Sequence, residues 1–397
     1  MSKILKVRGE ASDIDWVARA RDVAPLIGAA SDRTEQEGQV PQDIMEAMHA
    51  AQLFRMFLPR SIGGGEADPM VMMEVLEIVS GADASTGWCL GQALGCTFAA
   101  AFVAREVAED IFGPSDAVLA WGPPGPSKAI QVDGGYRSSG QWRFGSGSRN
   151  ATWLGGHSRV CDAEGKPLTN PNGSPRMRTM LFRKSEATMI DVWQVIGLRG
   201  TGSDNYATEN LFVPEAYTTW RDSEPDRRED GPLYHIPLLT CYGMAFSALA
   251  LGVGRSIMES FKELAADKVG GGTSTVLREN AVIQSKVAEA EAKILSSRAF
   301  LFDTVAEYWD VLCAGDPPSM DMRARLRLSI TYAMNQAREA ATFAYHSAGT
   351  NAIFEANPFE RRFRDMYTIS QQGQGHLSNY EPVGQVFLGL KPDGHRV

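Results

Sequence analysis

Residues 236–254 read IPLLTCYGMAFSALALGVG, which is a run of 19 residues without a charged side chain. A run of that length approaches the span of a membrane-crossing helix. It is rich in Gly, Ala, Ser and Thr, it has Pro237 near its start, and the sequence contains no second run of this kind. These features favour a helix buried at the centre of a helical bundle. We therefore predict no membrane span.

The sequence after this run indicates further long helices. Apolar residues recur at helical spacing from Ile283 to Val305, and Met320 to Ala348 is a second long run rich in Ala, Arg and Leu. Short Gly- and Pro-containing connections separate these runs. Residues 231–397 are therefore predicted to form a four-helix bundle.

The sequence before the run changes character twice. Residues 13–115 show helical periodicity, including one continuous run from Ser85 to Ile111. Residues 118–230 contain short β-rich runs, such as VLAWG and MRTMLFR, between Gly, Pro and Asn residues, which predict a small antiparallel sheet. Five of the eight tryptophans lie there, and we interpret Trp121, Trp153 and Trp220 as core residues. For Trp193, a core role and a place beside a flat cofactor stay equally open.

Composition excludes several classes of protein. The 397 residues carry a formal net charge of −9 and are 44% hydrophobic, which excludes a disordered chain and argues against a nucleic-acid partner. Five scattered cysteines without C-x-x-C spacing fit a reducing cytoplasm and give no zinc signal. The sequence lacks G-x-G-x-x-G after a strand, a P-loop and H-E-x-x-H, and its six histidines are well separated, so we predict no metal site.

Four stretches resemble the acyl-CoA dehydrogenase superfamily, and the likeness extends over about residues 15–390. They are WRFGSG from Trp142 to Gly147, VIGLRGTGS from 195 to 203 with LFVP from 211, Arg278 followed by Gln284, and FERRFRD from 359 to 365. The resemblance implies an α+β fold with an N-terminal helical domain (1–117), a central antiparallel β domain (118–230) and a C-terminal four-helix bundle (231–397).

The branch of the superfamily depends on a carboxylate. A dehydrogenase needs a base beside the thioester carbonyl, and its two usual places are near Gly373 and on the helix from 236 to 258. Neither place holds Asp or Glu in this sequence. The segment instead offers His376, at a place that resembles the two-component flavin monooxygenases of the same fold. An FAD-dependent acyl-CoA dehydrogenase with a displaced base, for which Glu381 is available, stays the alternative.

The monooxygenase resemblance implies a reaction and a set of partners. Such oxygenase components take reduced flavin from a separate reductase, form a C4a-hydroperoxide with molecular oxygen, and oxygenate an apolar, usually aromatic substrate. It implies reduced FMN as the cofactor, with FAD possible, and a cytoplasmic homotetramer. A third hypothesis is a protein of this fold that binds a partner and has no oxygen chemistry.

The resemblance also implies roles for individual residues. Ser146 would bind near the flavin N5, Trp193 would lie beside the flavin, and Arg278 would pair with the flavin phosphate of a neighbouring subunit. Trp88, Phe246 and His376 would line a dry substrate pocket, in which His376 would hold or move a proton near neutral pH. The alternatives are a turn role for Ser146 and His376 and a core role for Trp88. For Arg278 they are a surface helix charge or an inter-subunit salt bridge.

Overall fold

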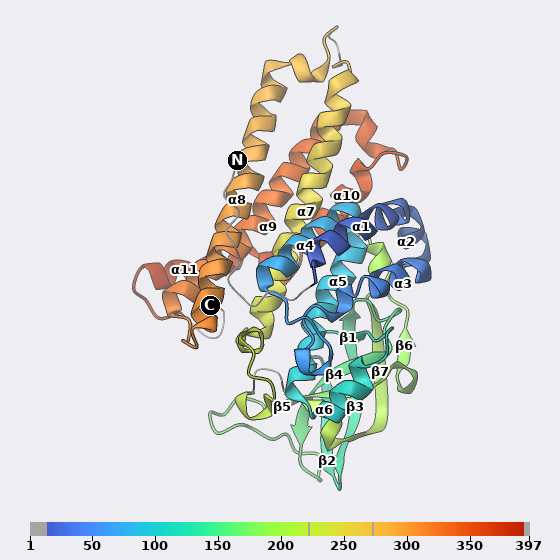
Figure 1. The fold of residues 1–397 in the computed structure, drawn as a ribbon, viewed down its shortest axis with the longest axis vertical. Helices are drawn as coiled ribbons and strands as arrows, with labels where there is room; N and C mark the ends of the chain where they lie inside the picture. Colours follow the sequence, from blue (N-terminus) through green and yellow to red (C-terminus); the bar gives the residue numbers. More distant parts are fainter. Residues whose placement is uncertain (1–13, 221–222, 272–273, 393–397) are drawn as a thin grey trace.

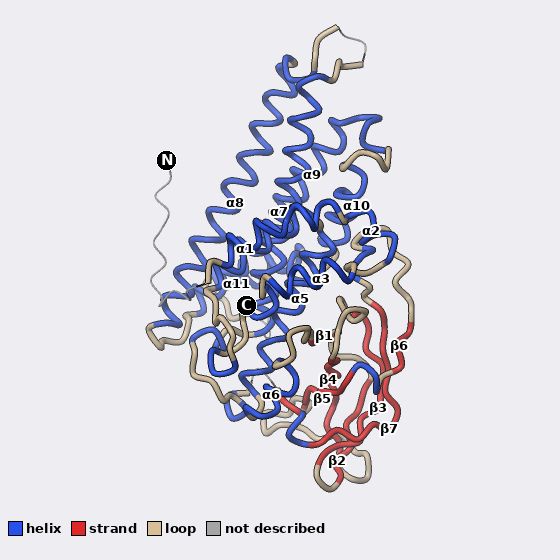
Figure 2. Tube along the Cα trace, turned by 45° about the vertical axis from the view of Figure 1, so that its right-hand side comes forward, coloured by secondary structure: helices blue, strands red, loops and turns tan. Residues whose placement is uncertain are grey.

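The computed structural model describes residues 14–220, 223–271 and 274–392, which form eleven α-helices and eight β-strands. Figure 1 shows the sheet at one end of the molecule, long helices extending away from it, and shorter N-terminal helices between the two. The strands gather in one body and the helices in another (Figure 2). This arrangement confirms the predicted fold class.

Six helices form the N-terminal part, and side-chain caps fix where several of them begin. Asp15, Asp68 and Asp83 each accept a hydrogen bond from a backbone N–H of the first turn, which stabilises the start of a helix. The helices are α1 (Trp16–Ala29), α2 (Ser31–Glu37), α3 (Gln42–Ala50), α4 (Pro69–Ala82), α5 (Ala84–Thr97) and α6 (Arg105–Phe112).

The helix expected over Ser85–Ile111 is interrupted. After α5 the chain tightens into a 3-10 helix at Phe98–Phe102, and α6 begins only at Arg105. The Thr97 hydroxyl donates to the Leu94 carbonyl at 2.7 Å, and such a bond competes with the helical backbone pattern. The whole 3-10 segment is buried, so its apolar residues gave no periodic signal in the sequence.

The central sheet has the strand order β6-β7-β3-β2-β4-β5-β8, with β1 added beside β4. The prediction of an antiparallel sheet is wrong at two pairings, since β2 and β1 both run parallel to β4. β2 and β3 pair as antiparallel neighbours, and β4 pairs with the other edge of β2, away from β3. β4 therefore runs in the same direction as β2. The strands are β1 (Leu119–Trp121), β2 (Ser127–Val132), β3 (Gly135–Gly145), β4 (Trp153–Cys161), β5 (Met177–Arg183), β6 (Thr188–Ile190), β7 (Asp204–Pro214) and β8 (Thr218–Thr219).

The C-terminal part is built on three long helices. They are α7 (Leu238–Asp267), α8 (Ala281–Cys313) and α9 (Met320–Ala348), followed by α10 (Phe359–Ile369) and α11 (Tyr380–Phe387). Although α7 is long and apolar enough to cross a membrane, 78% of its most apolar window is buried inside the protein. It packs against α4, α5 and α9, as its lack of charge predicts. Gly252 permits close contact with α4, because a Cβ there would lie 2.3 Å from the Glu77 carbonyl oxygen.

Candidate active site

Two turns meet beside the sheet and form the floor of the candidate site. One is at the end of β3, at residues 144–148, and the other precedes β7 at residues 198–203. The Gly147 N–H donates to the Thr201 carbonyl at 2.8 Å, and the Ser148 hydroxyl donates to the Gly202 carbonyl at 3.2 Å. These bonds join two of the stretches that carry the family resemblance.

A chain of buried hydroxyls crosses this floor. Trp88 Nε1 donates to Ser146 Oγ at 3.0 Å, Ser146 Oγ lies 2.7 Å from Ser203 Oγ, and Ser203 Oγ lies 2.7 Å from Thr201 Oγ1. Thr201 Oγ1 in turn donates to the Leu198 carbonyl at 2.9 Å. All three hydroxyl-bearing residues are at most 7% exposed. They therefore depend on one another for hydrogen bonds.

The two ends of the chain fix the direction of every hydrogen bond in it. A carbonyl can only accept, so Thr201 uses its single hydroxyl hydrogen on Leu198 and must accept from Ser203. Ser203 must then accept from Ser146, which leaves Ser146 without a free hydrogen. Because an indole N–H can only donate, Ser146 accepts from Trp88 and keeps one lone pair. Ser146 is thus set to accept one more hydrogen bond.

Apolar rings lie beside this hydroxyl chain. Phe144 is 57% exposed and contacts Trp193 edge to face, with 6.2 Å between the ring centroids. Trp193 is half-buried, and its Nε1 donates to the Leu198 carbonyl at 2.9 Å. Phe144 and Leu198 have φ angles of +56° and +53°, which cost energy for residues other than glycine and are concentrated at functional sites. Exposed rings beside an acceptor hydroxyl fit a flat cofactor with an N–H group.

The Arg-Asp motif of α10 holds the second turn. Asp365 Oδ1 accepts from the Leu198 N–H at 2.6 Å, and Arg364 Nη1 donates to the Ile196 carbonyl at 2.5 Å. Arg364 also pairs with Glu35 at 2.9 Å, so the turn is connected to α2 as well. Burial raises the pKa of Asp365 to about 7. The motif therefore positions the second turn from a distant part of the sequence.

An aromatic stack forms the wall opposite the sheet. Trp88 of α5 stacks on Phe246 of α7 with 4.1 Å between ring centroids, and Phe246 stacks on Tyr242 at 5.6 Å. The Tyr242 hydroxyl accepts from Trp121 Nε1 and from Gln92 Nε2, each at 3.0 Å. The structure thus brings Trp88, Phe246 and Ser146 together. Tyr242 was not predicted, although its spacing of four residues from Phe246 places both on one face of a helix.

His376 lies between two short 3-10 helices, Gly373–Gly375 and Leu377–Asn379, and its side chain is exposed. His376 Nδ1 lies 2.7 Å from the Ser378 hydroxyl, which fixes the orientation of the ring. No hydrogen bond or ring contact among the described residues connects His376 to Ser146, and its catalytic role stays a prediction.

A polar stripe on α9 holds this turn in place. Asn335 Nδ2 donates to the Gly375 carbonyl at 2.9 Å, and Thr331 Oγ1 donates to the Gln374 carbonyl at 3.3 Å. Arg327 Nη1 donates to Gln374 Oε1. Because Arg327, Thr331 and Asn335 are spaced by four residues, they share one face of α9. Sequence analysis did not identify this stripe.

The remaining candidates lie apart from the floor. The connection between α7 and α8 lies at the end of the molecule opposite the sheet (Figure 1). Arg278 is exposed in this connection, and its carbonyl accepts from Gln284 Nε2. The chain therefore does not bring Arg278 to its own Ser146. Glu381 is exposed on α11, and the first carboxylate on α7 is Glu259, beyond the buried segment. Within the described ranges, no three His, Cys, Asp or Glu residues form a potential metal site.

Comparisons with known proteins identify the family of the chain. Residues 19–110 match the acyl-CoA dehydrogenase N-terminal domain, and residues 244–374 match the acyl-CoA dehydrogenase C-terminal domain. The chain is 30% identical over 359 residues to an indole-3-acetate monooxygenase of Pseudomonas putida, with 90% of each protein covered. It is 28% identical to the oxygenase component of an FADH2-dependent resorcinol hydroxylase of a Rhizobium species, with 95% of each covered.

A solved structure shares the fold over nearly the whole chain. XiaF from a Streptomyces species, in complex with FADH2 and glycerol, superposes with a TM-score of 0.88 at 22% identity, covering 96% of this chain and 97% of that one.

Proposed function

Since this chain belongs to the acyl-CoA dehydrogenase superfamily, among the oxygenase components of flavin-dependent monooxygenases, we propose that its substrate is an apolar aromatic small molecule and that a separate reductase supplies its flavin. A bound reduced flavin supplies the two electrons with which one atom of molecular oxygen enters the product and the other leaves as water. The single observation that carries the proposal is the directed hydroxyl chain ending at Ser146.

Ser146 is suited to the reduced form of the cofactor. Its one remaining lone pair can accept from the N5–H of a reduced flavin, whereas the N5 of an oxidised flavin has no hydrogen to donate. The stack of Trp88 on Phe246 supplies apolar surface beside Ser146, and Trp193 adds a ring at the second turn. A dry site would protect reactive oxygen chemistry from side reactions. We assign proton transfer to His376, whose Nε2 has no hydrogen-bond partner among the described residues.

The acyl-CoA dehydrogenase alternative is less well supported. Its chemistry needs a carboxylate beside the cofactor. The buried part of α7, from Cys241 to Gly254, contains none, and a glycine occupies the start of the turn before His376. Glu381, the candidate for a displaced base, is exposed on α11, where water would surround its carboxylate.

A second subunit would complete the cofactor site. Arg278 is exposed in the connection between α7 and α8, and that connection lies at the end of the molecule opposite the sheet (Figure 1). We propose that it pairs with the flavin phosphate of a neighbouring subunit in a cytoplasmic homotetramer. An arginine is well suited to hold a phosphate through paired hydrogen bonds.

Stopped-flow spectroscopy tests the proposed function. Anaerobic protein is loaded with reduced FMN, or in parallel with reduced FAD, and is mixed with oxygenated buffer. We expect a long-lived absorbance transient that is neither reduced nor oxidised flavin. Reoxidation at the rate of free flavin with both cofactors would refute the proposal.

The role of His376 has its own test. We expect His376→Ala to bind reduced flavin normally but to release hydrogen peroxide in place of product. His346→Ala is the matched control, because His346 is also exposed. It lies in the last turn of α9, away from the residues of α9 that hold the turn before His376. Unchanged product formation per oxygen consumed in His376→Ala would assign the proton transfer to another residue.

A further inference from the structure

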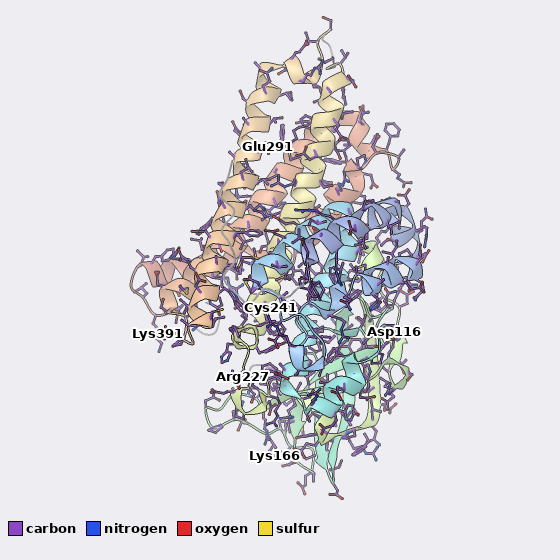
Figure 3. The ribbon with its side chains drawn as sticks, in the orientation of Figure 1. Asp116, Lys166, Arg227, Cys241, Glu291 and Lys391 are labelled. Carbon is purple, nitrogen blue, oxygen red and sulfur yellow. The ribbon has the colours of Figure 1, made fainter. Side chains whose placement is uncertain are left out.

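A series of aromatic rings in contact begins at the candidate site and reaches the junction between the helices and the sheet. Trp88 Nε1 donates to Ser146 Oγ at 3.0 Å, and the Trp88 ring stacks on Phe246 with 4.1 Å between the ring centroids. Phe246 stacks on Tyr242 at 5.6 Å, with 5° between the ring planes. Figure 3 shows Cys241, the residue before Tyr242, at this junction. Aromatic rings at such separations are in direct contact, so the first part of the series joins α5 to α7.

The series continues from α7 into the sheet. Trp121 of β1 donates from its Nε1 to the Tyr242 hydroxyl at 3.0 Å. The Trp121 ring lies 5.2 Å from the ring of His157 on β4, and His157 contacts Trp220 edge to face at 6.3 Å. Trp121 is 1% exposed and His157 is 4% exposed. This middle part of the series is therefore closed to dissolved molecules.

The far end of the series is accessible to solvent. Trp220, expected to be a core residue, is only half-buried, because β8 is a two-residue strand at the edge of the sheet and the chain leaves the sheet directly after it. Trp220 lines a cavity of about 880 Å³ between the start of β5, the segment after β8 and the beginnings of α7 and α9. A cavity of this size accommodates a small organic molecule, which would meet the Trp220 ring.

The rings of the series differ in how easily they lose an electron. An indole is among the side chains most easily oxidised by one electron, whereas the phenyl ring of Phe246 resists oxidation. The Tyr242 hydroxyl accepts hydrogen bonds from Trp121 and from Gln92, and accepted hydrogen bonds withdraw electron density from a phenol and make its oxidation harder. The three indoles are therefore the electron carriers, and the other rings provide the contact between them.

We propose that Trp88, Trp121 and Trp220 form an electron-transfer path that protects the candidate site from oxygen-centred radicals. Such a radical forms when an O–O bond breaks homolytically and no oxygen atom reaches the substrate. The inference goes beyond the proposed function and rests on it for the oxidant, because the reaction of reduced flavin with oxygen supplies the O–O bond. The path would remove the oxidising equivalent from a buried site in which it would otherwise damage side chains.

Each step of the path moves one electron. The oxygen-centred radical takes one electron from Trp88 and one proton from water, and its oxygen becomes a hydroxyl group. Trp121 then reduces the Trp88 radical cation, and Trp220 reduces the Trp121 radical cation. The Trp220 radical cation releases its indole proton to water. A hydrogen-atom donor in the cavity, such as ascorbate or a thiol, returns one electron and one proton to Trp220 and becomes a radical itself.

Flash photolysis tests the path without oxygen. Anaerobic protein saturated with oxidised FMN receives a blue flash, so that the excited flavin takes an electron from Trp88. We expect a long-lived tryptophan radical in wild type, because the electron vacancy moves from Trp88 to Trp220, away from the flavin. Trp121→Phe should lose this long-lived radical, because the vacancy stays at Trp88 and recombines with the flavin radical. Trp220→Phe should keep a long-lived radical but lose the faster decay that added ascorbate causes in wild type.

Trp153→Phe is the matched control. Trp153 is a buried tryptophan of the same sheet, but its ring partner among the described residues is Tyr217, outside the series. The control should keep the long-lived radical and its response to ascorbate. Absence of a tryptophan radical in wild type, the wild-type decay in Trp121→Phe, or an equal loss in Trp153→Phe would overturn the proposal. If Trp121→Phe does not fold, the response of Trp220→Phe to ascorbate still decides.

Peptide mapping by mass spectrometry tests the protective role. Protein is sampled after many turnovers with reduced flavin and oxygen but without substrate. We expect oxidation products at Trp220 in wild type and at Trp88 in Trp121→Phe. Oxidation of wild type at Trp88 and not at Trp220 would overturn the proposal.

Failure of the proposed function would look different. The flash experiment uses oxidised flavin without oxygen, whereas the stopped-flow transient needs reduced flavin and oxygen. Wild type that shows the tryptophan radical but lacks the transient would refute the proposed function and not the electron path. Wild type that shows the transient but lacks the tryptophan radical would refute the path alone.

Discussion

Replacing Ser203 with alanine would test the direction of the hydroxyl chain. Ser203 is 2% exposed, and its hydroxyl lies 2.7 Å from both Ser146 Oγ and Thr201 Oγ1. The substitution removes two buried hydrogen bonds, each worth about 0.5–1.5 kcal/mol net. We expect the free energy of unfolding to fall by about 1–3 kcal/mol.

The effect on flavin binding is more specific. In Ser203→Ala the hydroxyl hydrogen of Ser146 no longer has an acceptor at Ser203, so it can point to N5 of an oxidised flavin. The expected preference for reduced over oxidised flavin should then weaken by the free energy of about one hydrogen bond, near 1 kcal/mol. The ratio of the dissociation constants of oxidised and reduced flavin should fall about five-fold.

Anaerobic and aerobic titrations with FMN measure this ratio. Ser148→Ala is the control, because Ser148 bonds to the Gly202 carbonyl in the same pair of turns but lies outside the hydroxyl chain. The control should lose stability without changing the ratio. A folded Ser203→Ala protein with the wild-type ratio, or an equal change in both variants, would refute the assigned direction.

Three further predictions follow from the site. Asn335→Ala should lower the free energy of unfolding in urea by about 1–3 kcal/mol and increase peroxide release, because it leaves the buried Gly375 carbonyl unpaired. Burial raises the pKa of Asp365 from 3.8 to about 7, so the folded state holds more protons than the unfolded state. Wild-type stability should therefore fall relative to Asp365→Asn as pH rises from about 4 to 7, by at most about 1.4 kcal/mol per unit, in calorimetric scans. Trp88→Phe should keep the ring stack but remove the donor to Ser146, and an assay of hydrogen peroxide should show more release.

The long helices were predictable, because their residue patterns are compatible with only one environment. The charge-free run of α7 can only be buried, and the run from Met320 to Ala348 matches α9 at both ends. The break after Thr97 escaped prediction because the 3-10 segment is apolar on every side. The parallel pairing of β2 with β4 escaped as well, because it depends on which edges meet in space.

The candidate site was only partly predictable for a related reason. Ser146, Trp88 and Phe246 were named from the family resemblance, and the structure places them together. Ser203 and Arg327 gave no signal, because a hydroxyl or a guanidinium in the sequence does not reveal its partner. Their meaning arises from hydrogen bonds and charges that only the folded chain brings together.

The bond between Leu198 and Asp365 has a consequence for the order of folding. These residues are separated by 167 positions, so the second turn of the candidate site is held by a segment that leaves the ribosome long after the sheet. Closing so long a loop is slow compared with forming local helices and hairpins. The candidate site is therefore expected to be one of the last parts of the chain to take shape, and a polypeptide truncated before α10 should fold its sheet without the second turn in place.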